Sequence, residues 1–118
     1  FWDLNNLKII NDTYGHEYGD KALSALASVL YAHSDEQCRR VYRFGGDEFV
    51  MIIDNPHDGE AELIISAVKD ELVKCSYDIS IEISSAVGVA SGNGSDIIEI
   101  VKNADSAMYA DKQLYHHR

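Results

Sequence analysis

The stretch Arg43-Phe44-Gly45-Gly46-Asp47-Glu48-Phe49 places two glycines directly before two carboxylates, with apolar sequence on both sides. The flanking runs, 39–44 and 49–53, are typical of strands, so the glycine pair predicts the turn of a hairpin. The second run is apolar on both faces, which indicates a central strand. Two adjacent like charges at this turn leave two interpretations open. Either it is an acidic tip in solvent whose glycines adopt positive φ, or its carboxylates hold a cation.

The segments on both sides of this hairpin predict a sheet with helices packed against it. Before it, residues 1–4 indicate the end of a strand, 5–11 is a short apolar segment, and 20–32 has the apolar stripe of a helix. After it, a helix follows Asp58 as its N-cap residue, and alternating side chains over 79–89 predict a strand. A last helix follows a glycine-containing loop. The order strand, helices, hairpin, helix, strand, helix predicts one α+β or α/β domain without internal repeats.

Composition and charge narrow the class of protein. The 118 residues suffice for one domain, and 46% hydrophobic with 25% charged residues is typical of a globular protein. The net charge of −10 argues against nucleic-acid or direct membrane contact, although metal ions can still mediate binding of a phosphate ligand. No apolar run approaches the roughly 20 residues that span a bilayer. We predict a cytoplasmic domain in a reducing compartment. Several metal-ligating side chains have no ligand spacing: Cys38, Cys75, His33, His57, His116 and His117.

A third acid, Asp3, stands at the end of a different predicted strand. If that strand pairs with the hairpin, Asp3 and Asp47 converge at one edge of the sheet. Two carboxylates and a backbone carbonyl, completed by water and phosphate oxygens, form a site of the kind that Mg²⁺ prefers. A pair of such ions can activate an attacking hydroxyl and stabilise the leaving oxygen in nucleotidyl transfer. From spacing alone, both the metal site and the solvated acidic turn stay open.

Three motifs in this sequence resemble the GGDEF domain of the diguanylate cyclase family. The first is the RFGGDEF signature from Arg43, and the second runs from Asp3 to His16 with Gly19-Asp20 behind it. The third, Asn103-Ala104-Asp105-Ser106-Ala107-Met108-Tyr109-Ala110-Asp111-Lys112, is similar to the family's ADxALYxAK helix. Together they cover nearly the whole chain. The resemblance implies an α+β fold like the palm of nucleotidyl cyclases and polymerases, with a mainly antiparallel central sheet flanked by helices.

The resemblance implies a bacterial signalling enzyme, a nucleotidyltransferase that condenses two GTP molecules into cyclic di-GMP and releases two pyrophosphates. Each chain of a homodimer would hold one GTP, and two Mg²⁺ or Mn²⁺ ions would serve each GTP site. The alternative is a non-catalytic GGDEF module that binds GTP or a partner domain and regulates a neighbouring domain. The intact acids Asp3, Asp47 and Glu48 favour the catalytic interpretation.

The family motifs also imply a role for individual residues. By position, Asp3, the Leu4 carbonyl and Asp47 are metal ligands, and Glu48 is the second family acid. Glu48 would either help to deprotonate the attacking hydroxyl or assist the metals, and both roles stay open. Asp3, Asp47 and Glu48 together form the implied catalytic set.

Other positions match contacts to the nucleotide. Asn11 and Asp20 match the positions that read guanine, since a carboxylate accepts from guanine N1–H and N2–H₂ and an Asn amide can meet N3. Without the resemblance, both are ordinary turn and cap residues. The implied phosphate contacts are the cations Lys8, Lys112 and Arg43, and the glycines Gly45 and Gly46, where a Cβ would obstruct the approach of the phosphates.

The chain departs from the family pattern at two places. The RxxD product-inhibition motif would occupy 36–39, which reads Glu-Gln-Cys-Arg with its end charges reversed, so we expect no product inhibition there. His116 replaces an Arg that commonly contacts phosphate, and a His is mostly uncharged at neutral pH. The family's N-terminal helical segment with DxLTGLxNR, and a strand after Lys112, are missing from the sequence. We therefore expect 1–118 to be a single GGDEF domain from a longer protein with an N-terminal sensory domain, whose parent chain can be membrane-anchored.

Overall fold

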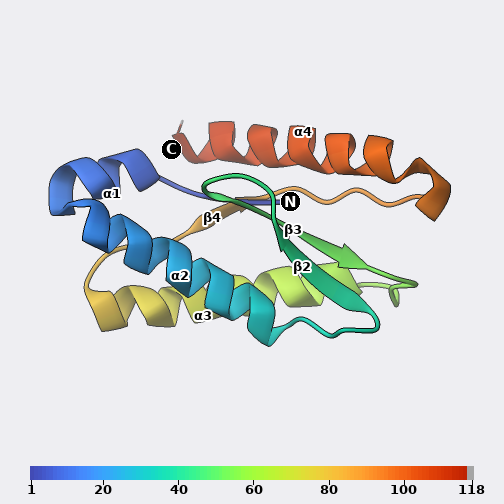
Figure 1. The fold of residues 1–118 in the computed structure, drawn as a ribbon, viewed down its shortest axis with the longest axis horizontal. Helices are drawn as coiled ribbons and strands as arrows, with labels where there is room; N and C mark the ends of the chain where they lie inside the picture. Colours follow the sequence, from blue (N-terminus) through green and yellow to red (C-terminus); the bar gives the residue numbers. More distant parts are fainter. Residues whose placement is uncertain (117–118) are drawn as a thin grey trace.

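A computed structural model describes residues 1–116, and His117 and Arg118 lie outside the described residues. Figure 1 shows the arrangement of its elements. In chain order these are β1 Trp2–Leu4, α1 Leu7–Tyr14, α2 His16–Ala32, β2 Arg39–Arg43, β3 Glu48–Ile53, α3 Glu60–Ile79, β4 Ser85–Val87, a 3₁₀ turn η1 Gly94–Asp96 and α4 Ile97–His116. The predicted order of strands and helices is confirmed. Among the described helices, none is both long and apolar enough to cross a bilayer.

The four strands form one antiparallel sheet in the order β2-β3-β1-β4. The predicted α+β fold with a mainly antiparallel sheet is therefore confirmed, and β3 lies inside the sheet, as its apolar composition indicated. In the β2–β3 hairpin, Arg43 pairs with Phe49 across the glycine turn. On the other side of β3, Trp2 pairs with Phe49 and Asp3 with Glu48. This register places two of the predicted catalytic acids directly opposite each other.

Helices cover both faces of the sheet: α2 and α3 lie on one face and α4 on the other (Figure 1). Because side chains alternate along a strand, Trp2 and Leu4 of β1 enter the core that α2 and α3 cover. Asp3, between them, faces the opposite side, toward α4. On β3, Val50 belongs to the smaller core beneath α4 together with Met108. Glu48, two residues before Val50, shares that face.

Helix α4 lies very close to the segment that follows β4. A Cβ added at Gly88 would lie 2.1 Å from both the Ala104 carbonyl oxygen and the Met108 amide nitrogen. The side chain of Asp111 accepts a hydrogen bond of 3.0 Å from the Val87 backbone N–H. Backbone contact at Gly88 and this hydrogen bond together fix which face of α4 lies over the sheet.

The N-terminal helices differ from the prediction in their extent. Residues Leu7–Tyr14 form α1, where the sequence indicated only a short apolar segment, and α2 begins at His16 rather than at Asp20. Gly15 separates the two helices with a φ of 98°, a conformation that side chains other than glycine rarely adopt. The prediction of a turn at this point is confirmed, but the helix on each side of it is longer than the apolar pattern suggested.

The region around β4 contains the largest error of the sequence interpretation. The alternating run 79–89 predicts one long strand, yet Ile79 ends α3, and only Ser85–Val87 pair in the sheet. Ser80 adopts a left-handed conformation with a φ of 59° and turns the chain away from the helix axis. Ile81 and Ile83 are buried without strand structure, so their alternation reflects burial alone. Asp58 does not cap α3, whose N-cap residue is Gly59.

Candidate active site

Three carboxylates lie near one another where β1 and β3 pair, and two of them, Asp3 and Glu48, face α4. Asp3 is buried, with 8% of its surface exposed, and lies opposite Glu48. Asp47 precedes Glu48 at the hairpin turn, and its backbone carbonyl accepts a hydrogen bond of 3.4 Å from the Leu4 N–H. Asp47 and Glu48 are both half-buried. The structure therefore brings together the three acids that the sequence assigns to catalysis.

Lys112 reaches this acidic cluster from α4. Its Nζ lies 2.8 Å from Asp3 Oδ2 and 3.5 Å from the Leu4 carbonyl oxygen. The ion pair is largely shielded from water, because 23% of the Lys112 side chain and 12% of the Asp3 side chain are exposed. The ammonium group thus contacts two of the groups that the sequence assigns to a metal ion. The other carboxylate oxygen, Asp3 Oδ1, is buried and has no hydrogen-bond partner.

Two acids of the cluster, Asp3 and Glu48, bind protons more readily than they do in water. Burial raises the pKa of Asp3, the nearby Asp47 carboxylate raises it further, and the hydrogen bond from Lys112 opposes the shift. Burial also raises the pKa of Glu48, and the negative charges of Asp3 and Asp105 add to the effect. Burial is the main cause of both shifts, and the neighbouring negative charges add to them. A cation bound beside these carboxylates would lower both pKa values.

The groups around Asp3 fit a hard divalent cation. Asp3, Asp47 and the Leu4 carbonyl offer only oxygen ligands, which suit Mg²⁺ or Mn²⁺ rather than softer metals. The unpartnered, buried Asp3 Oδ1 is an acceptor that such an ion would satisfy. Within residues 1–116 no three or more His, Cys, Asp or Glu side chains are arranged to hold a metal. The predicted set of two carboxylates and one carbonyl is smaller than such a group, and water and phosphate oxygens would complete it.

The glycine turn is held by Arg43. The Arg43 guanidinium donates through Nε to the Gly45 carbonyl at 3.3 Å and through Nη2 to the Gly46 carbonyl. Neither glycine has a positive φ, so that part of the solvated-tip interpretation is wrong. A Cβ at Gly46 would meet nothing within 4 Å, and one at Gly45 would meet Glu48 Oε1 at 3.2 Å. The surface of the turn is therefore open to a ligand.

The two residues predicted to read guanine lie where α1 and α2 meet. Asn11, in α1, has a buried Oδ1 without a hydrogen-bond partner. That oxygen lies directly over Gly19 of α2, because a Cβ at Gly19 would be 1.8 Å from it. Asp20, the next residue, is exposed. The absence of a side chain at Gly19 thus makes room for the Asn11 amide beside Asp20.

Lys8, His116 and one further acid complete the candidate site residues. Lys8 is exposed on α1 and forms no ion pair with any residue between 1 and 116. His116 contacts the Tyr115 ring edge-on at 5.7 Å and is exposed. Asp105 was not predicted, yet its charge contributes to the raised pKa of Glu48. Its helical spacing to Met108 and Lys112, three and seven residues apart on one face of α4, is the sequence signal that could have identified it.

The window where the family carries RxxD lies at the opposite end of the β2–β3 hairpin from the glycine turn. There Arg39 pairs with Ile53 in the sheet, and its Nε donates to Glu60 Oε2 at 2.9 Å. Glu60 is held in turn, because its Oε1 accepts from the His57 backbone N–H at 3.0 Å. The one arginine of this window is thus engaged with α3.

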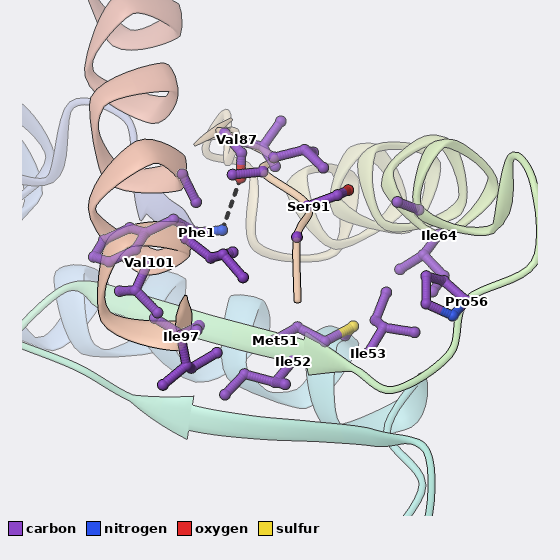
Figure 2. Close-up of a pocket in the computed structure, with 18 of the residues that line it drawn as sticks. Phe1, Met51, Ile52, Ile53, Pro56, Ile64, Val87, Ser91, Ile97 and Val101 are labelled. Atoms are coloured by element: carbon purple, nitrogen blue, oxygen red, sulfur yellow. Dashed lines mark hydrogen bonds between the residues drawn. The ribbon is translucent and has the colours of Figure 1, made fainter. Parts of the chain in front are cut away.

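An apolar cavity of about 490 Å³ lies elsewhere on the molecule, beside the start of β1. Figure 2 shows Ile52 of β3 on the α4 side of the cavity with Ile97 and Val101, whereas Met51 and Ile53 pack against the core that includes Ile64 of α3. None of the residues that the sequence assigns to catalysis or binding lines this cavity. The candidate site is therefore the charged cluster at the other end of β3, not the apolar cavity.

An antiparallel sheet with acids at the end of its β1–β3 pair, and helices on both faces, defines a nucleotidyl-cyclase-like α+β domain. The chain belongs to the GGDEF family, since residues 1–118 match the family model described as diguanylate cyclase, GGDEF domain. It is 37% identical over 114 residues to "Probable diguanylate cyclase DgcI" of Escherichia coli (strain K12), covering 97% of this chain and 24% of that protein. It is 34% identical over 119 residues to "Signaling protein YkoW" of Bacillus subtilis (strain 168), covering 96% of this chain and 15% of that protein. The chain thus spans less than a quarter of the length of these two relatives.

Solved structures agree with this assignment. The active GGEEF domain of a diguanylate cyclase from Vibrio cholerae matches with a TM-score of 0.78 and 27% identity, over 95% of this chain and 73% of that one. The diguanylate cyclase SiaD from Pseudomonas aeruginosa, solved with its activator SiaC, matches with a TM-score of 0.80 and 25% identity, over 95% and 44%. The predicted GGDEF fold is therefore confirmed.

Proposed function

We propose that this domain is a diguanylate cyclase, which joins two GTP molecules into cyclic di-GMP and releases two pyrophosphates. The observation that carries the proposal is that Asp3 pairs with Glu48 across β1 and β3 and lies near Asp47, with Lys112 bound to Asp3 and the Leu4 carbonyl. Relatives named diguanylate cyclase support the same chemistry. In this proposal the 3′-hydroxyl of one GTP attacks the α-phosphate of the other.

Divalent ions would be held by Asp3, the Leu4 carbonyl and Asp47, two ions to each GTP site. When bound, such an ion stabilises charge on the phosphate oxygens and makes the attacking hydroxyl more acidic. Glu48 lies beside this set, and burial together with the negative charge of Asp3 raises its pKa, which makes it a stronger base. In its other proposed role Glu48 helps to hold the ions.

The remaining side chains would bind and orient the nucleotide. Asn11 and Asp20 read the guanine edge, and the room above Gly19 sets the position of the Asn11 amide. Lys8 and Lys112 supply positive charge to the triphosphate. Arg43 holds the Gly45-Gly46 turn in a shape that a phosphate can approach.

Each chain in this proposal supplies one GTP, so the reaction requires a homodimer. In this proposal the domain functions in the cytoplasm and follows an N-terminal sensory domain in a longer chain. The proposal includes no product inhibition through the 36–39 window, because Arg39 is engaged with Glu60 and the end charges of the motif are reversed.

The test is turnover of GTP by the full-length protein with Mg²⁺ or Mn²⁺, with cyclic di-GMP measured by chromatography. We expect product from the natural protein and none from Asp47→Ala. Asp70→Ala is the matched control, because it removes a carboxylate from α3, on the other face of the sheet. Binding of GTP without turnover, at concentrations where the protein is dimeric, would replace the proposal with the non-catalytic module.

A further inference from the structure

We propose that Lys112 is an internal counter-ion that occupies the divalent-cation site until the phosphates of a nucleotide attract its ammonium group away. In this arrangement Lys112 makes metal binding depend on nucleotide binding. The inference rests on the proposed function, because it takes the metal and the triphosphate to bind at this cluster. It concerns the binding of metal and nucleotide before the reaction. It gives Lys112 a role in metal binding in addition to its proposed contact with phosphate.

The first argument is that the ammonium group and the metal compete for the same atoms. Lys112 Nζ contacts Asp3 Oδ2 at 2.8 Å and the Leu4 carbonyl at 3.5 Å. A Mg²⁺ ion binds oxygen at about 2.0–2.1 Å and carries twice the charge. An ammonium at hydrogen-bond distance from these oxygens therefore excludes an ion that takes either of them as a ligand.

The second argument is that Asp3 needs a cation at all times. A carboxylate with 8% exposure is stable in its charged form only when it is paired. In the metal-free protein Lys112 provides this pairing, although only through Oδ2, since Oδ1 remains without a partner. Lys112 thus pairs Asp3 through one carboxylate oxygen and leaves the other unsatisfied.

The third argument is that only the lysine side chain has to move. Helix α4 is fixed against the sheet through the close contact at Gly88 and the hydrogen bond from Val87 to Asp111. Lys112 follows Asp111 directly, so its backbone is held in place while its flexible stem and its ammonium group remain free to exchange partners. A triphosphate next to the cluster would offer the ammonium new anionic partners as the metal takes Asp3. By linkage, each ligand then raises the affinity of the other by the same factor.

The experiment measures Mn²⁺ binding, by electron paramagnetic resonance of free Mn²⁺, to the natural protein and to Lys112→Met. Lys102→Met is the matched control, because Lys102 is an exposed residue of the same helix and carries the same charge. Without nucleotide, we expect Lys112→Met to bind Mn²⁺ roughly tenfold more tightly than the natural protein, which corresponds to about 1.4 kcal/mol. Lys102→Met should stay within about twofold of the natural value.

A second titration contains a GTP analogue whose bond between the α- and β-phosphates cannot be cleaved. The analogue should raise the Mn²⁺ affinity of the natural protein by a larger factor than that of Lys112→Met. Mn²⁺ binding by Lys112→Met that is unchanged, weaker, or no tighter than that of Lys102→Met would overturn the inference while leaving the proposed function intact. If neither protein binds Mn²⁺, with or without the analogue, the metal site of the proposed function fails as well.

A measurement on the natural protein covers the case in which Lys112→Met does not fold. Brief acetylation followed by mass spectrometry reports how accessible each lysine amine is. Without nucleotide, we expect Lys112 to be protected in the presence of a chelator and to react faster at Mn²⁺ concentrations that saturate the site, with Lys102 as the internal reference. Equal labelling of Lys112 under both conditions overturns the inference.

Discussion

The substitution Gly19→Ala is expected to separate the stability of this fold from the proposed recognition of guanine. A Cβ at Gly19 would lie 1.8 Å from Asn11 Oδ1 and 2.8 Å from Asn11 Cγ. Ordinary contacts of a Cβ begin at about 3.4 Å, so the Asn11 oxygen has to move by about 1.6 Å. Asn11 then leaves the position that we assign to guanine.

The same substitution has little reason to unfold the protein. Alanine in a helix is favoured over glycine by up to about 1 kcal/mol, and Gly19 lies within α2 with an ordinary helical φ. The displaced Asn11 Oδ1 has no hydrogen-bond partner to lose. We therefore expect a melting temperature no lower than that of the natural protein. Losing one hydrogen bond to the base costs about 0.5–1.5 kcal/mol, which weakens GTP binding by roughly two- to tenfold.

The assay combines calorimetric titration of a non-hydrolysable GTP analogue with urea denaturation. Ser24→Ala, an exposed change in the same helix, controls for helix propensity. In an Asn11→Ala background, Gly19→Ala should not weaken GTP binding further, because Gly19→Ala affects the guanine base only by displacing the Asn11 side chain. The reasoning is refuted if Gly19→Ala binds GTP normally while Asn11→Ala does not, or if it destabilises the fold by several kcal/mol.

Three more outcomes follow from the same contacts. Gly88→Ala would place a Cβ 2.1 Å from backbone atoms of α4 and force that helix away from the sheet. We expect the free energy of unfolding in urea to fall by about 1–3 kcal/mol, and an unchanged midpoint would contradict the described packing. Asp3 has a raised pKa, so its contribution to stability is full below about pH 3.8 and is lost as the pH rises through the folded-state pKa. The melting temperature of Asp3→Asn minus that of the natural protein should thus increase as the pH rises above about 3.8 in chelator, and a difference that decreases refutes the sign. Excess cyclic di-GMP should not slow turnover, and strong inhibition would show that the 36–39 window binds product after all.

Local chemistry made the hairpin and the helix order predictable. Two glycines between apolar runs form a turn whatever lies around them, and the apolar stripe of 20–32 faces the core as the spacing indicates. The run 79–89 could not be resolved in this way. Because Ile81 and Ile83 are buried beside the end of α3, apolar and polar residues alternate there as they would in a strand. Only the left-handed conformation of Ser80 distinguishes this segment from a strand.

The candidate site was predictable in its membership and much less in its geometry. Motif positions identified Asp3, Asp47 and Lys112, but the Asp3–Glu48 pairing depends on the register between strands far apart in the sequence. The Lys112–Asp3 contact depends on how closely α4 approaches Gly88, which no local pattern encodes. Local sequence therefore indicates which residues belong to the site, whereas long-range packing determines which of them touch.

The central claim is that Asp3, Asp47 and Glu48 form one catalytic site for joining two GTP molecules. The most direct measurement is cyclic di-GMP formation by the full-length protein with GTP and Mg²⁺, for the natural protein and for Asp47→Ala, with each variant's fold verified by its melting curve. We predict product from the natural protein and none from the folded Asp47→Ala variant. Equal product from both, or GTP bound by a dimeric natural protein without any turnover, would contradict the claim.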